Sequence, residues 1–466
     1  MNDLHTADLA AALADASGAA ALINVDVDRN DVDLNRLSAA HDAMPRFLEA
    51  LADLVEAACA RHGRATLVTV HGWNVVEPRV DVGLGCLPGA EPLAVPPTAA
   101  VSPAFARTGV GALVRACDAH DIHATVGARY PARARENLVQ LFTRRHRDDP
   151  RPLVRRLVAS HERCDALQLE LGIPLRWPGA WRDRLAGAWA AALPALCGAA
   201  APVDDVLAVP LAAPAPRALS LAGRDARALL AVDPLGARLL LFPGDGTLLL
   251  FTAEHAGSAH PALGLHIVDD GDGVVASFRG PVARCPDTTP FVDLEHGLAR
   301  ATIVDDVHLA LRFAPDLTAD GGRFGVVRGA VHVGPQRIAL DGTGFLGTAM
   351  RGAGTRGDLR LTLRLGPERA VAVTVSAGGA AEGSVAGPAG TRRVRSGRAV
   401  LGPAHDPLGR IRVALALDDE TLRLDLVAVD RLPVVRSSAP PNRHLWASCR
   451  LADHAQAVGW CELAAS

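Results

Sequence analysis

The first two hundred residues alternate between two spacings of hydrophobic positions. Residues 7–17 and 44–62 carry apolar side chains at helical spacing, and a glycine follows each run. The apolar runs at 65–73 and 166–171 are typical of buried strands. Alternating strands and helices predict an α/β domain with a mostly parallel sheet, which we assign to residues 1–200.

Four further segments extend this pattern. The run ALINVDV at 21–27 predicts another strand. Helical spacing at 105–119 and 178–197 predicts two more helices. The segment 133–147 also has helical spacing and predicts a helix with an arginine-rich face.

After residue 200 the helical spacing nearly disappears. Short apolar runs such as ARLLLFP and LRLDLVAVD follow one another, and Gly, Asp-Gly or Pro separates most of them. More than ten such runs predict an all-β region over residues 201–466, folded as a sandwich, one large barrel or two packed barrels. We expect any subdivision near residue 315, and we interpret 199–216 as a linker or as the first part of this region.

Composition and charge exclude several classes of protein. The formal net charge is -3, so the chain lacks the basic balance expected of a nucleic-acid-binding protein. Residues 1–20 lack a basic start followed by an apolar run, and no stretch reaches about 18 uninterrupted apolar residues. We therefore expect no secretory signal and no membrane span. The 8 cysteines form no CxxC pair, which is typical of reduced thiols in a cytoplasmic protein.

Arg36 ends the polar segment DRNDVDLNR at 28–36. An arginine placed after a strand can present its guanidinium to the carboxylate of a ligand through two parallel hydrogen bonds. The alternative is a local ion pair with one of the aspartates in the same segment. Alone, this motif favours the local ion pair.

His71 ends an apolar strand and precedes Gly72. Ligands of open α/β sheets collect at the carboxyl ends of strands, so a histidine there is well placed to bind a metal ion. The alternative is a structural histidine at the end of a strand.

Glu170 interrupts an apolar strand in which the leucines occupy one face and Gln168 and Glu170 occupy the other. Burying a carboxylate is costly unless the group is paired or functional. Such a group suits a general base that activates water. The alternative is a structural glutamate paired with a buried arginine.

Together, the motifs DLNR, VHG and LQLEL occur in an order that resembles the N-formylglutamate amidohydrolase family. This family is related to the zinc carboxypeptidases and to the succinylglutamate desuccinylase and aspartoacylase group. Its VDLNR segment precedes a strand that ends in DLH, and a later ALQLE strand carries the catalytic glutamate. Here the matching segments are 32–36, 70–71 and 166–170, and ATVGARYPARA at 124–134 looks like the strand and Gly-Arg turn between them. The resemblance covers about residues 3–197.

The resemblance implies a phosphorylase/hydrolase-like fold and a role for each matching residue. Arg36 and Asn35 would hold the carboxylate of the substrate, and Arg129 would assist them. His71 would be a zinc ligand, and Glu170 would be the general base. The implied activity is zinc-dependent hydrolysis of an N-acylated amino acid or a similar small carboxylate.

One part of the family pattern is missing. The first two metal ligands of the family come from a segment well upstream of DLNR, whereas Asn35 lies close to the beginning of this chain. A catalytic zinc usually has three protein ligands. We therefore expect either that the sequence is truncated at its N-terminus or that the metal has been lost. In the second case the chain would be a catalytically degenerate ligand-binding protein.

The β-rich half resembles the lipocalin-like domains of the AttH and carotenoid-hydratase families. The resemblance rests on GGRFGVVRGAVHVGPQRIALDGTGFLGT at 321–348 and on HLWASCRLADHAQAVGWCEL at 444–463. It implies a barrel with an interior that holds an apolar small molecule. The alternative is a structural or interaction module.

Overall fold

The computed structural model divides the chain into two compact units, residues 1–212 with 256–261 and residues 213–255 with 262–466. The predicted linker at 199–216 lies outside the described residues. No described helix is long and apolar enough to cross a membrane. The structure describes residues 3–25, 27–89, 93–198, 217–223, 226–233, 236–254, 263–286, 294–319, 321–347, 358–403, 407–435, 443–452 and 458–465.

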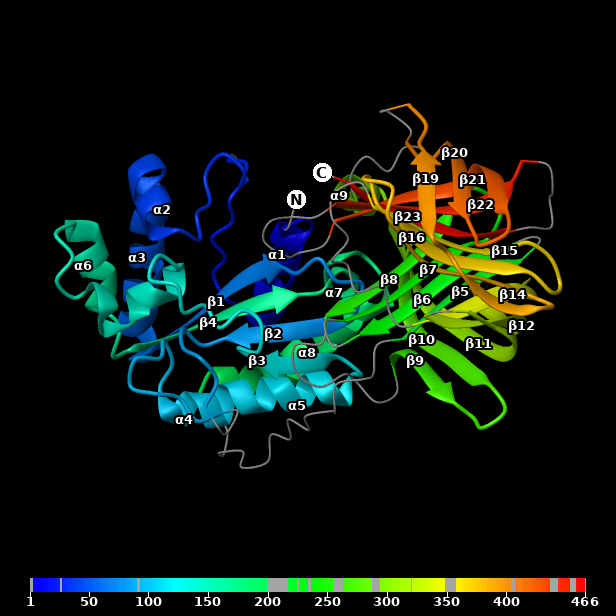
Figure 1. Ribbon diagram of the computed structural model, residues 1–466. Helices are drawn as coiled ribbons and strands as arrows, with labels where there is room; N and C mark the ends of the chain where they lie inside the picture. The colour runs from blue at the N-terminus through cyan, green and yellow to red at the C-terminus, as the bar shows by residue number, and fades with distance from the viewer. Residues whose placement is uncertain are drawn as a thin grey trace. The chain divides into compact units, whose positions relative to one another are not determined.

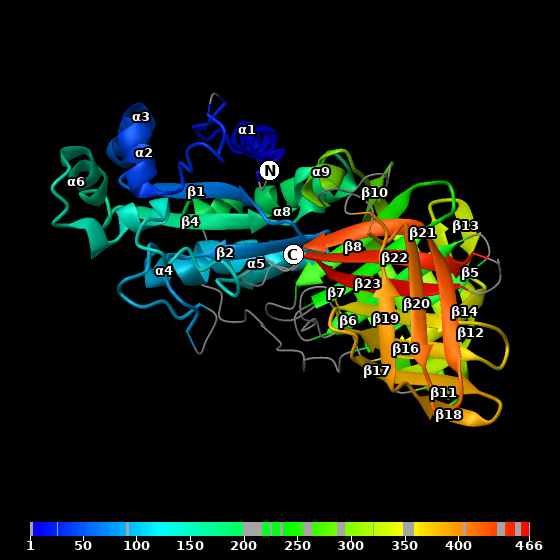
Figure 2. The same ribbon diagram turned by 45° about the horizontal axis from the view of Figure 1, so that its top comes forward.

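The first unit packs helices around a sheet of four strands (Figure 1). Helices α5 and α8 lie side by side along the sheet, and α2, α3 and α6 gather at one end of β1 and β4 (Figures 1 and 2). The strands are β1 (Ala65–Gly72), β2 (Arg79–Gly83), β3 (His123–Val126) and β4 (Cys164–Leu171). The helices are α1 (Thr6–Ser17), α2 (Leu37–Ala43), α3 (Pro45–His62), α4 (Pro103–Phe105), α5 (Gly111–Ala119), α6 (Pro152–Val158), α7 (Ile173–Arg176) and α8 (Ala180–Leu196).

This sheet is mixed, with the strand order β1-β4-β2-β3. The pairs β1–β4 and β2–β3 are parallel, whereas β2 runs antiparallel to β4. The segment 73–78, which connects β1 to β2, is too short for the crossover that a parallel return requires. The predicted predominance of parallel pairing therefore holds for two of the three pairs.

Most of the predicted elements in this unit are confirmed, and their ends follow local chemistry. Helix α3 begins with Pro45 in its first turn and ends at Gly63, whose φ of 78° suits a residue without a Cβ atom. The predicted helix at 105–119 is α4, a π-helical turn over Ala106–Val110, and α5.

Two predicted elements are wrong. The described residues 21–25 form no strand and are largely exposed, so their strand propensity has no pairing partner to stabilise it. The segment 133–147 contains two short 3-10 turns in place of a helix. The side chains of Asn137 and Thr143 accept hydrogen bonds from the amides of Val139 and Arg145, and such local bonds compete with helix formation.

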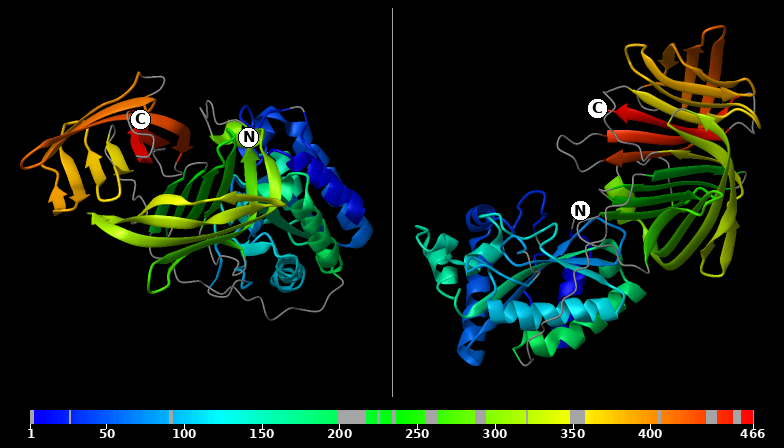
Figure 3. Two further views of the ribbon diagram at one scale, coloured as in Figure 1. Left: turned by 90° about the vertical axis from the view of Figure 1, so that its right-hand side faces the viewer. Right: turned by 60° about the horizontal axis from the view of Figure 1, so that its bottom comes forward.

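The second unit is all β apart from the short helix α9 (Leu294–Ala299) among its described residues. Its first sheet contains β5 to β14 and curls strongly (Figure 3). Neighbouring strands pair in the order β11-β10-β8-β7-β6-β5-β14-β12-β13. Because β12 also pairs with β11, the hydrogen-bonded strands form a closed circuit. These strands are β5 (Arg217–Gly223), β6 (Arg227–Asp233), β7 (Gly236–Phe242), β8 (Leu248–Glu254), β9 (Gly264–Asp269), β10 (Val274–Cys285), β11 (Thr302–Ala319), β12 (Gly322–Val333), β13 (Gln336–Ala339) and β14 (Gly342–Gly347).

The second sheet of this unit has the order β18-β17-β16-β15-β23-β22-β21-β20-β19. The predicted subdivision near residue 315 falls inside β11, and the described chain changes sheet between β14 and β15. The strands of this sheet are β15 (Leu359–Arg364), β16 (Ala370–Val375), β17 (Ala381–Gly387), β18 (Gly390–Arg393), β19 (Ser396–Val400), β20 (Arg410–Ala416), β21 (Thr421–Val435), β22 (Arg443–Leu451) and β23 (Val458–Ala465).

Candidate functional site

Four polar residues form one row across the sheet of the first unit. His71 of β1 pairs with Glu170 of β4, which pairs with Asp81 of β2, and Asp81 pairs with Thr125 of β3. Residues in register across neighbouring strands point to the same face, so this row gathers a histidine and two carboxyl groups on one face. His71 and Glu170 also lie at the carboxyl ends of their strands, where the sequence predicted a site.

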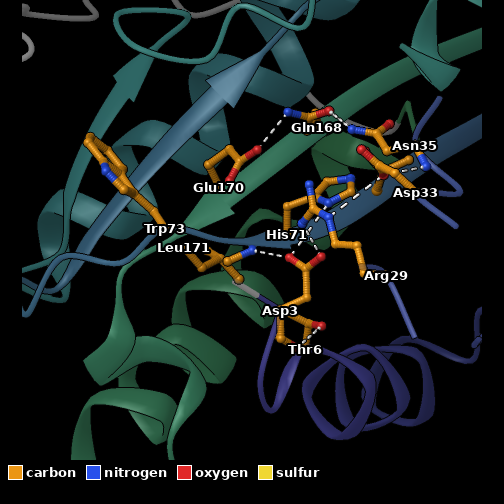
Figure 4. A network of polar contacts seen from close by, with 12 residues as sticks. Asp3, Thr6, Arg29, Asp33, Asn35, His71, Trp73, Gln168, Glu170 and Leu171 are labelled. Atoms are coloured by element: carbon orange, nitrogen blue, oxygen red, sulfur yellow. Dashed lines mark hydrogen bonds and ion pairs between the residues drawn. The ribbon is translucent and has the colours of Figure 1, made fainter. Parts of the chain in front are cut away.

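The Glu170 side chain lies at the end of a chain of amide groups. Its Oε1 accepts a 2.9 Å hydrogen bond from Gln168 Nε2, and Glu170 as a whole is 8% exposed. Gln168 Oε1 accepts hydrogen bonds from Asn137 at 2.8 Å and from Asn35 at 3.2 Å. The two asparagines therefore fix the orientation of Gln168, which turns its NH₂ group towards Glu170 (Figure 4).

The proton affinity of Glu170 is unusually high for a carboxyl group. Burial raises its pKa to about 7, with a smaller increase from the negative charges of Asp3 and Asp81 and an opposing effect of His71 and Arg29. A carboxyl group with this pKa exchanges protons readily near neutral pH, which is the property required of a general base.

Asp3 brings the beginning of the chain to His71. Its Oδ1 accepts a 2.8 Å hydrogen bond from the amide of Gly72 and lies 3.8 Å from His71 Nδ1. Its Oδ2 accepts a hydrogen bond from Arg29. Figure 4 shows Asp3 and Arg29 on one side of the His71 ring and Glu170 and Gln168 on the other.

The environment of Asp3 favours its ionised form. Burial alone would raise the pKa of Asp3, but the His71 ring, the Arg29 guanidinium and the Gly72 amide together hold it well below its usual range. Asp3 and Glu170 therefore have pKa values shifted in opposite directions on the two sides of His71. Carboxyl groups whose pKa values are separated in this way can take different roles in acid–base chemistry.

Arg176 fixes the segment that carries Asp3. This arginine is fully buried, and it donates hydrogen bonds to the carbonyls of Leu4 at 2.8 Å and Leu171 at 3.0 Å. It also donates to the carbonyl of Trp73 at 3.2 Å. One guanidinium thus ties the ends of β1 and β4 to the first residues of the chain. Burial lowers the pKa of Arg176 to about 10, so the group stays charged at neutral pH.

Arg36 directly follows Asn35 in the chain. Its position is compatible with binding a ligand carboxylate and with a local ion pair. Its side chain is 51% exposed, and its Nε lies 3.4 Å from Asp33 Oδ2, which is the local ion pair considered as the alternative. The neighbouring residue Asn35 reaches Gln168 and accepts a hydrogen bond from the amide of Leu138 at 3.4 Å. The DLNR motif is therefore connected to Glu170 through a single side chain.

Asp81 holds the turn that carries Arg129. The buried carboxylate of Asp81 accepts hydrogen bonds from Thr125 Oγ1 at 2.8 Å and from the amides of Ala128 at 3.0 Å, Arg129 at 2.8 Å and Tyr130 at 2.6 Å. The Arg129 side chain is exposed, while its backbone is tied to the strand next to β4. Of the residues predicted for the site, Asn35 is connected to Glu170 through Gln168, and His71 pairs with Glu170 across the sheet. The Arg36 side chain contacts Asp33, and Arg129 is attached to Asp81 through its backbone amide.

The residues present do not complete a zinc site. Over the described ranges, no group of three or more His, Cys, Asp or Glu side chains is placed to hold a metal ion. His71 Nδ1 is buried without a hydrogen-bond partner, which alone would suit a metal ligand. However, Asp3 is its nearest carboxylate, and both oxygens of Asp3 already accept hydrogen bonds from Gly72 and Arg29.

Sequence reasoning missed several members of this network. Asp81 and Arg176 each stand as a single charge in an apolar run, VDV and IPLRW, which is the same signal that identified Glu170. Asp3 and Arg29 carry no comparable signal, because they are charged residues in polar segments and reach His71 only through the fold.

No protein-family model matches this chain, and no curated protein matches it. The amidohydrolase and lipocalin-like resemblances therefore stay predictions.

Proposed function

We propose that the α/β unit binds a small carboxylate, of the class of N-acylated amino acids, and hydrolyses its amide bond. The observation that carries this proposal is the buried Glu170 carboxyl group, whose pKa is about 7 and which lies in register with His71 at the ends of two parallel strands. A structural glutamate would have a buried arginine partner, whereas the hydrogen bond to Glu170 comes from the neutral amide of Gln168.

In the proposed reaction the Glu170 carboxylate accepts a proton from a water molecule. The oxygen of that water attacks the acyl carbon of the substrate, so that a carbon–oxygen bond forms and the carbonyl oxygen becomes negative. The carbon–nitrogen bond then breaks, and Glu170 gives its proton to the leaving amine. The products are a carboxylic acid and a free amino acid. Since the described residues do not complete a zinc site, no step is assigned to a metal ion.

Arg36 is the group we assign to the carboxylate of the substrate. Half of its side chain faces solvent, and its contact with Asp33 is a single 3.4 Å approach of the Nε atom. The guanidinium has five N–H donors, so this contact leaves donors for a bidentate pair with a ligand. Arg129, whose backbone is fixed by Asp81, is the second cation in this proposal.

The test is hydrolysis of N-formyl, N-acetyl and N-succinyl derivatives of glutamate and aspartate by the purified full chain. We expect Glu170→Gln to lower kcat at least about a hundredfold, and Arg36→Ala to raise KM more than it lowers kcat. Arg46→Ala, at an exposed position of α3, is the matched control and should leave both constants unchanged. Absence of turnover with the whole panel, or full activity of Glu170→Gln, would refute the proposal.

A second candidate function is binding of the same ligands without hydrolysis. It is favoured by the incomplete metal site and by the ion pair of Asp3 with Arg29 beside His71. In this case the β unit would be the binder of an apolar small molecule, since its first sheet surrounds a large apolar cluster that includes Leu239, Phe251 and Phe313.

Calorimetric titration with the same N-acyl amino acids separates the two functions. Binding that Arg36→Ala weakens, together with no turnover, would favour the binding protein. Solvent extraction of the purified full chain followed by mass spectrometry would reveal an apolar ligand of the β unit. An extract without such a compound would count against that part of the second candidate.

A further inference from the structure

We propose that Arg29 supplies the positive charge that a metal ion supplies in metal-dependent amidohydrolases, so that this site works without a bound metal. The role of Arg29 towards a substrate rests on the proposed function. Whether the protein binds a metal ion can be tested separately, without a substrate.

Arg29 lies next to the carboxylate that is beside His71. Its guanidinium donates a hydrogen bond to Asp3, and its Nε lies 3.7 Å from Asp33 Oδ1. The other oxygen of Asp3 lies 3.8 Å from His71 Nδ1. A single carboxylate therefore separates the guanidinium from the histidine that the family pattern identifies as a zinc ligand.

The groups around His71 are poorly suited to hold a zinc ion. A zinc ion bound to His71 would need further anionic ligands, and Asp3 is the nearest carboxylate among the residues that the structure describes. Binding through Asp3 would place a divalent cation next to the guanidinium of Arg29, which is a repulsive arrangement. The next carboxylate, Glu170, already accepts a hydrogen bond from Gln168. The guanidinium of Arg29 is therefore the cation that pairs with the carboxylate beside His71.

The guanidinium of Arg29 can also stabilise negative charge that develops in the reaction. Attack of water on an amide makes its carbonyl oxygen negative, and hydrogen-bond donors or a positive group at that point lower the barrier. Arg29 is held by two carboxylates, and 34% of its side chain is exposed. A guanidinium has five N–H donors, more than these two contacts require, so it can also bind a developing oxyanion.

Asp3 is the positioning residue in this arrangement. It binds Arg29 directly, and its own place is fixed by the Gly72 amide and, through the adjacent Leu4 carbonyl, by the buried Arg176. We therefore expect Asp3→Asn to weaken the role of Arg29 without touching the substrate itself. Arg29→Lys keeps the charge but loses the planar fork, and should retain part of the function.

The first arm of the test is zinc binding. Wild-type protein, His71→Ala and Arg29→Met are titrated with zinc chloride by calorimetry after chelation, and the metal content of the purified proteins is measured by mass spectrometry. We expect wild type and His71→Ala to bind zinc equally weakly. One zinc per wild-type chain, with an affinity that His71→Ala lowers tenfold or more, would overturn the proposal.

The second arm compares two probes, N-acetylglutamate and N-(methylphosphonyl)glutamate, whose tetrahedral anion imitates the intermediate. In the presence of a chelator, Arg29→Met should weaken the phosphonyl compound at least about tenfold more than the acetyl compound. Arg29→Lys and Asp3→Asn should give intermediate losses, and Arg46→Met at an exposed position of α3 should give none. Equal losses for both probes would refute the oxyanion role of Arg29.

The two arms distinguish the two proposals. If wild-type protein binds neither probe, the proposed function and the oxyanion role of Arg29 both fail, while the zinc titration still decides whether a metal belongs to the site. If Arg29→Met unfolds, as judged by circular dichroism, Arg29→Lys provides the comparison, and its failure to distinguish the two probes would also refute the role.

Discussion

The amide of Gly72 donates a 2.8 Å hydrogen bond to the carboxylate of Asp3. This bond joins the end of β1 to a residue near the beginning of the chain, and it places a negative charge directly beside His71. The residues of the site therefore come from two parts of the chain. His71 and Glu170 come from the ends of neighbouring strands, and the charged pair of Asp3 and Arg29 comes from the segments that precede the sheet in the sequence.

Glu170 should make the stability of the first unit depend on pH. Its pKa is raised from 4.5 to about 7 in the folded chain, so the folded state binds its proton more tightly than the unfolded state does. The stabilisation is complete below pH 4.5 and is lost as the pH rises to about 7. We expect the free energy of unfolding to fall by about 3 kcal/mol across this interval from this one group.

The measurement is urea unfolding of wild type and Glu170→Gln between pH 4.5 and pH 8. The glutamine variant lacks the titrating group, so the difference between the two proteins should change with pH in this interval and become constant above it. Glu49→Gln, at an exposed position of α3, serves as the control and should run parallel to wild type. A difference that is independent of pH would contradict the raised pKa of Glu170.

Asp81→Asn should loosen the turn that carries Arg129. The asparagine keeps the shape of the side chain but replaces one carboxylate oxygen with an NH₂ group, which faces amides that can only donate. The buried carboxylate accepts hydrogen bonds from the amides of Ala128 and Tyr130 as well as that of Arg129. We expect a loss of about 2–4 kcal/mol and faster hydrogen exchange at 128–130.

Hydrogen exchange followed by mass spectrometry, together with urea unfolding, measures both effects. The control is Asp118→Asn on the exposed side of α5, which should change stability by less than about 0.5 kcal/mol. Unchanged exchange at 128–130 in Asp81→Asn would show that the carboxylate does not organise this turn.

Arg176→Met should release the segment that contains Asp3. The substitution keeps an unbranched apolar side chain but removes the hydrogen bonds that the guanidinium donates to the carbonyls of Leu4 and Leu171, of which Leu171 keeps the bond from the Trp73 amide. Since Arg176 itself is fully buried, we expect a loss of about 3 kcal/mol. The first residues should also become sensitive to proteolysis. Arg184→Met removes an exposed ion pair with Asp121 and a cation–π contact with Trp181, and should cost about 1 kcal/mol.

Arg364→Met should weaken the second unit. Arg364 of β15 donates hydrogen bonds to Asp316 of β11 at 2.8 Å and to the carbonyl of Gly366 at 3.0 Å, and its side chain is 9% exposed. Because β11 and β15 belong to different sheets, this arginine connects the two sheets of the unit. We expect a loss of about 1–3 kcal/mol, measured by thermal unfolding.

Arg395→Met is the matched control for this prediction. Arg395 forms a 2.7 Å ion pair with Asp418 in which both side chains are exposed, and such pairs contribute little to stability. Equal losses for Arg364→Met and Arg395→Met would mean that burial of the arginine between the sheets has no special effect.

Hydrophobic spacing predicted most of the fold because most elements bury one face. The leucines of β4 and the apolar stripe of α3 are examples, and both elements formed at the expected residues. Spacing failed at 133–147, where the apolar side chains are indeed buried but the local hydrogen bonds of Asn137 and Thr143 divide the backbone into 3-10 turns. It also could not give strand direction, which depends on the short connection between β1 and β2.

The candidate site was predictable only in part. Glu170 and His71 could be identified because each is a polar residue within an apolar strand or at the end of one. Their partners Asp3 and Arg29 carried no such signal, because they are distant in sequence from both strands and charged residues are ordinary in polar segments. Only the fold brings Asp3 to the Gly72 amide and Arg29 to Asp3.

The row formed by His71, Glu170, Asp81 and Thr125 has a consequence for the order of folding. His71 and Glu170 are separated by roughly a hundred residues, and long-range pairings of this kind close late because their loop entropy must be overcome first. Side chains alternate between the two faces of a strand, so a slip of β4 by one residue would exchange Glu170 for a leucine. The chemistry of the site can therefore appear only after the sheet has reached its correct register, and gain of activity during refolding would report that β1 and β4 have paired in this register.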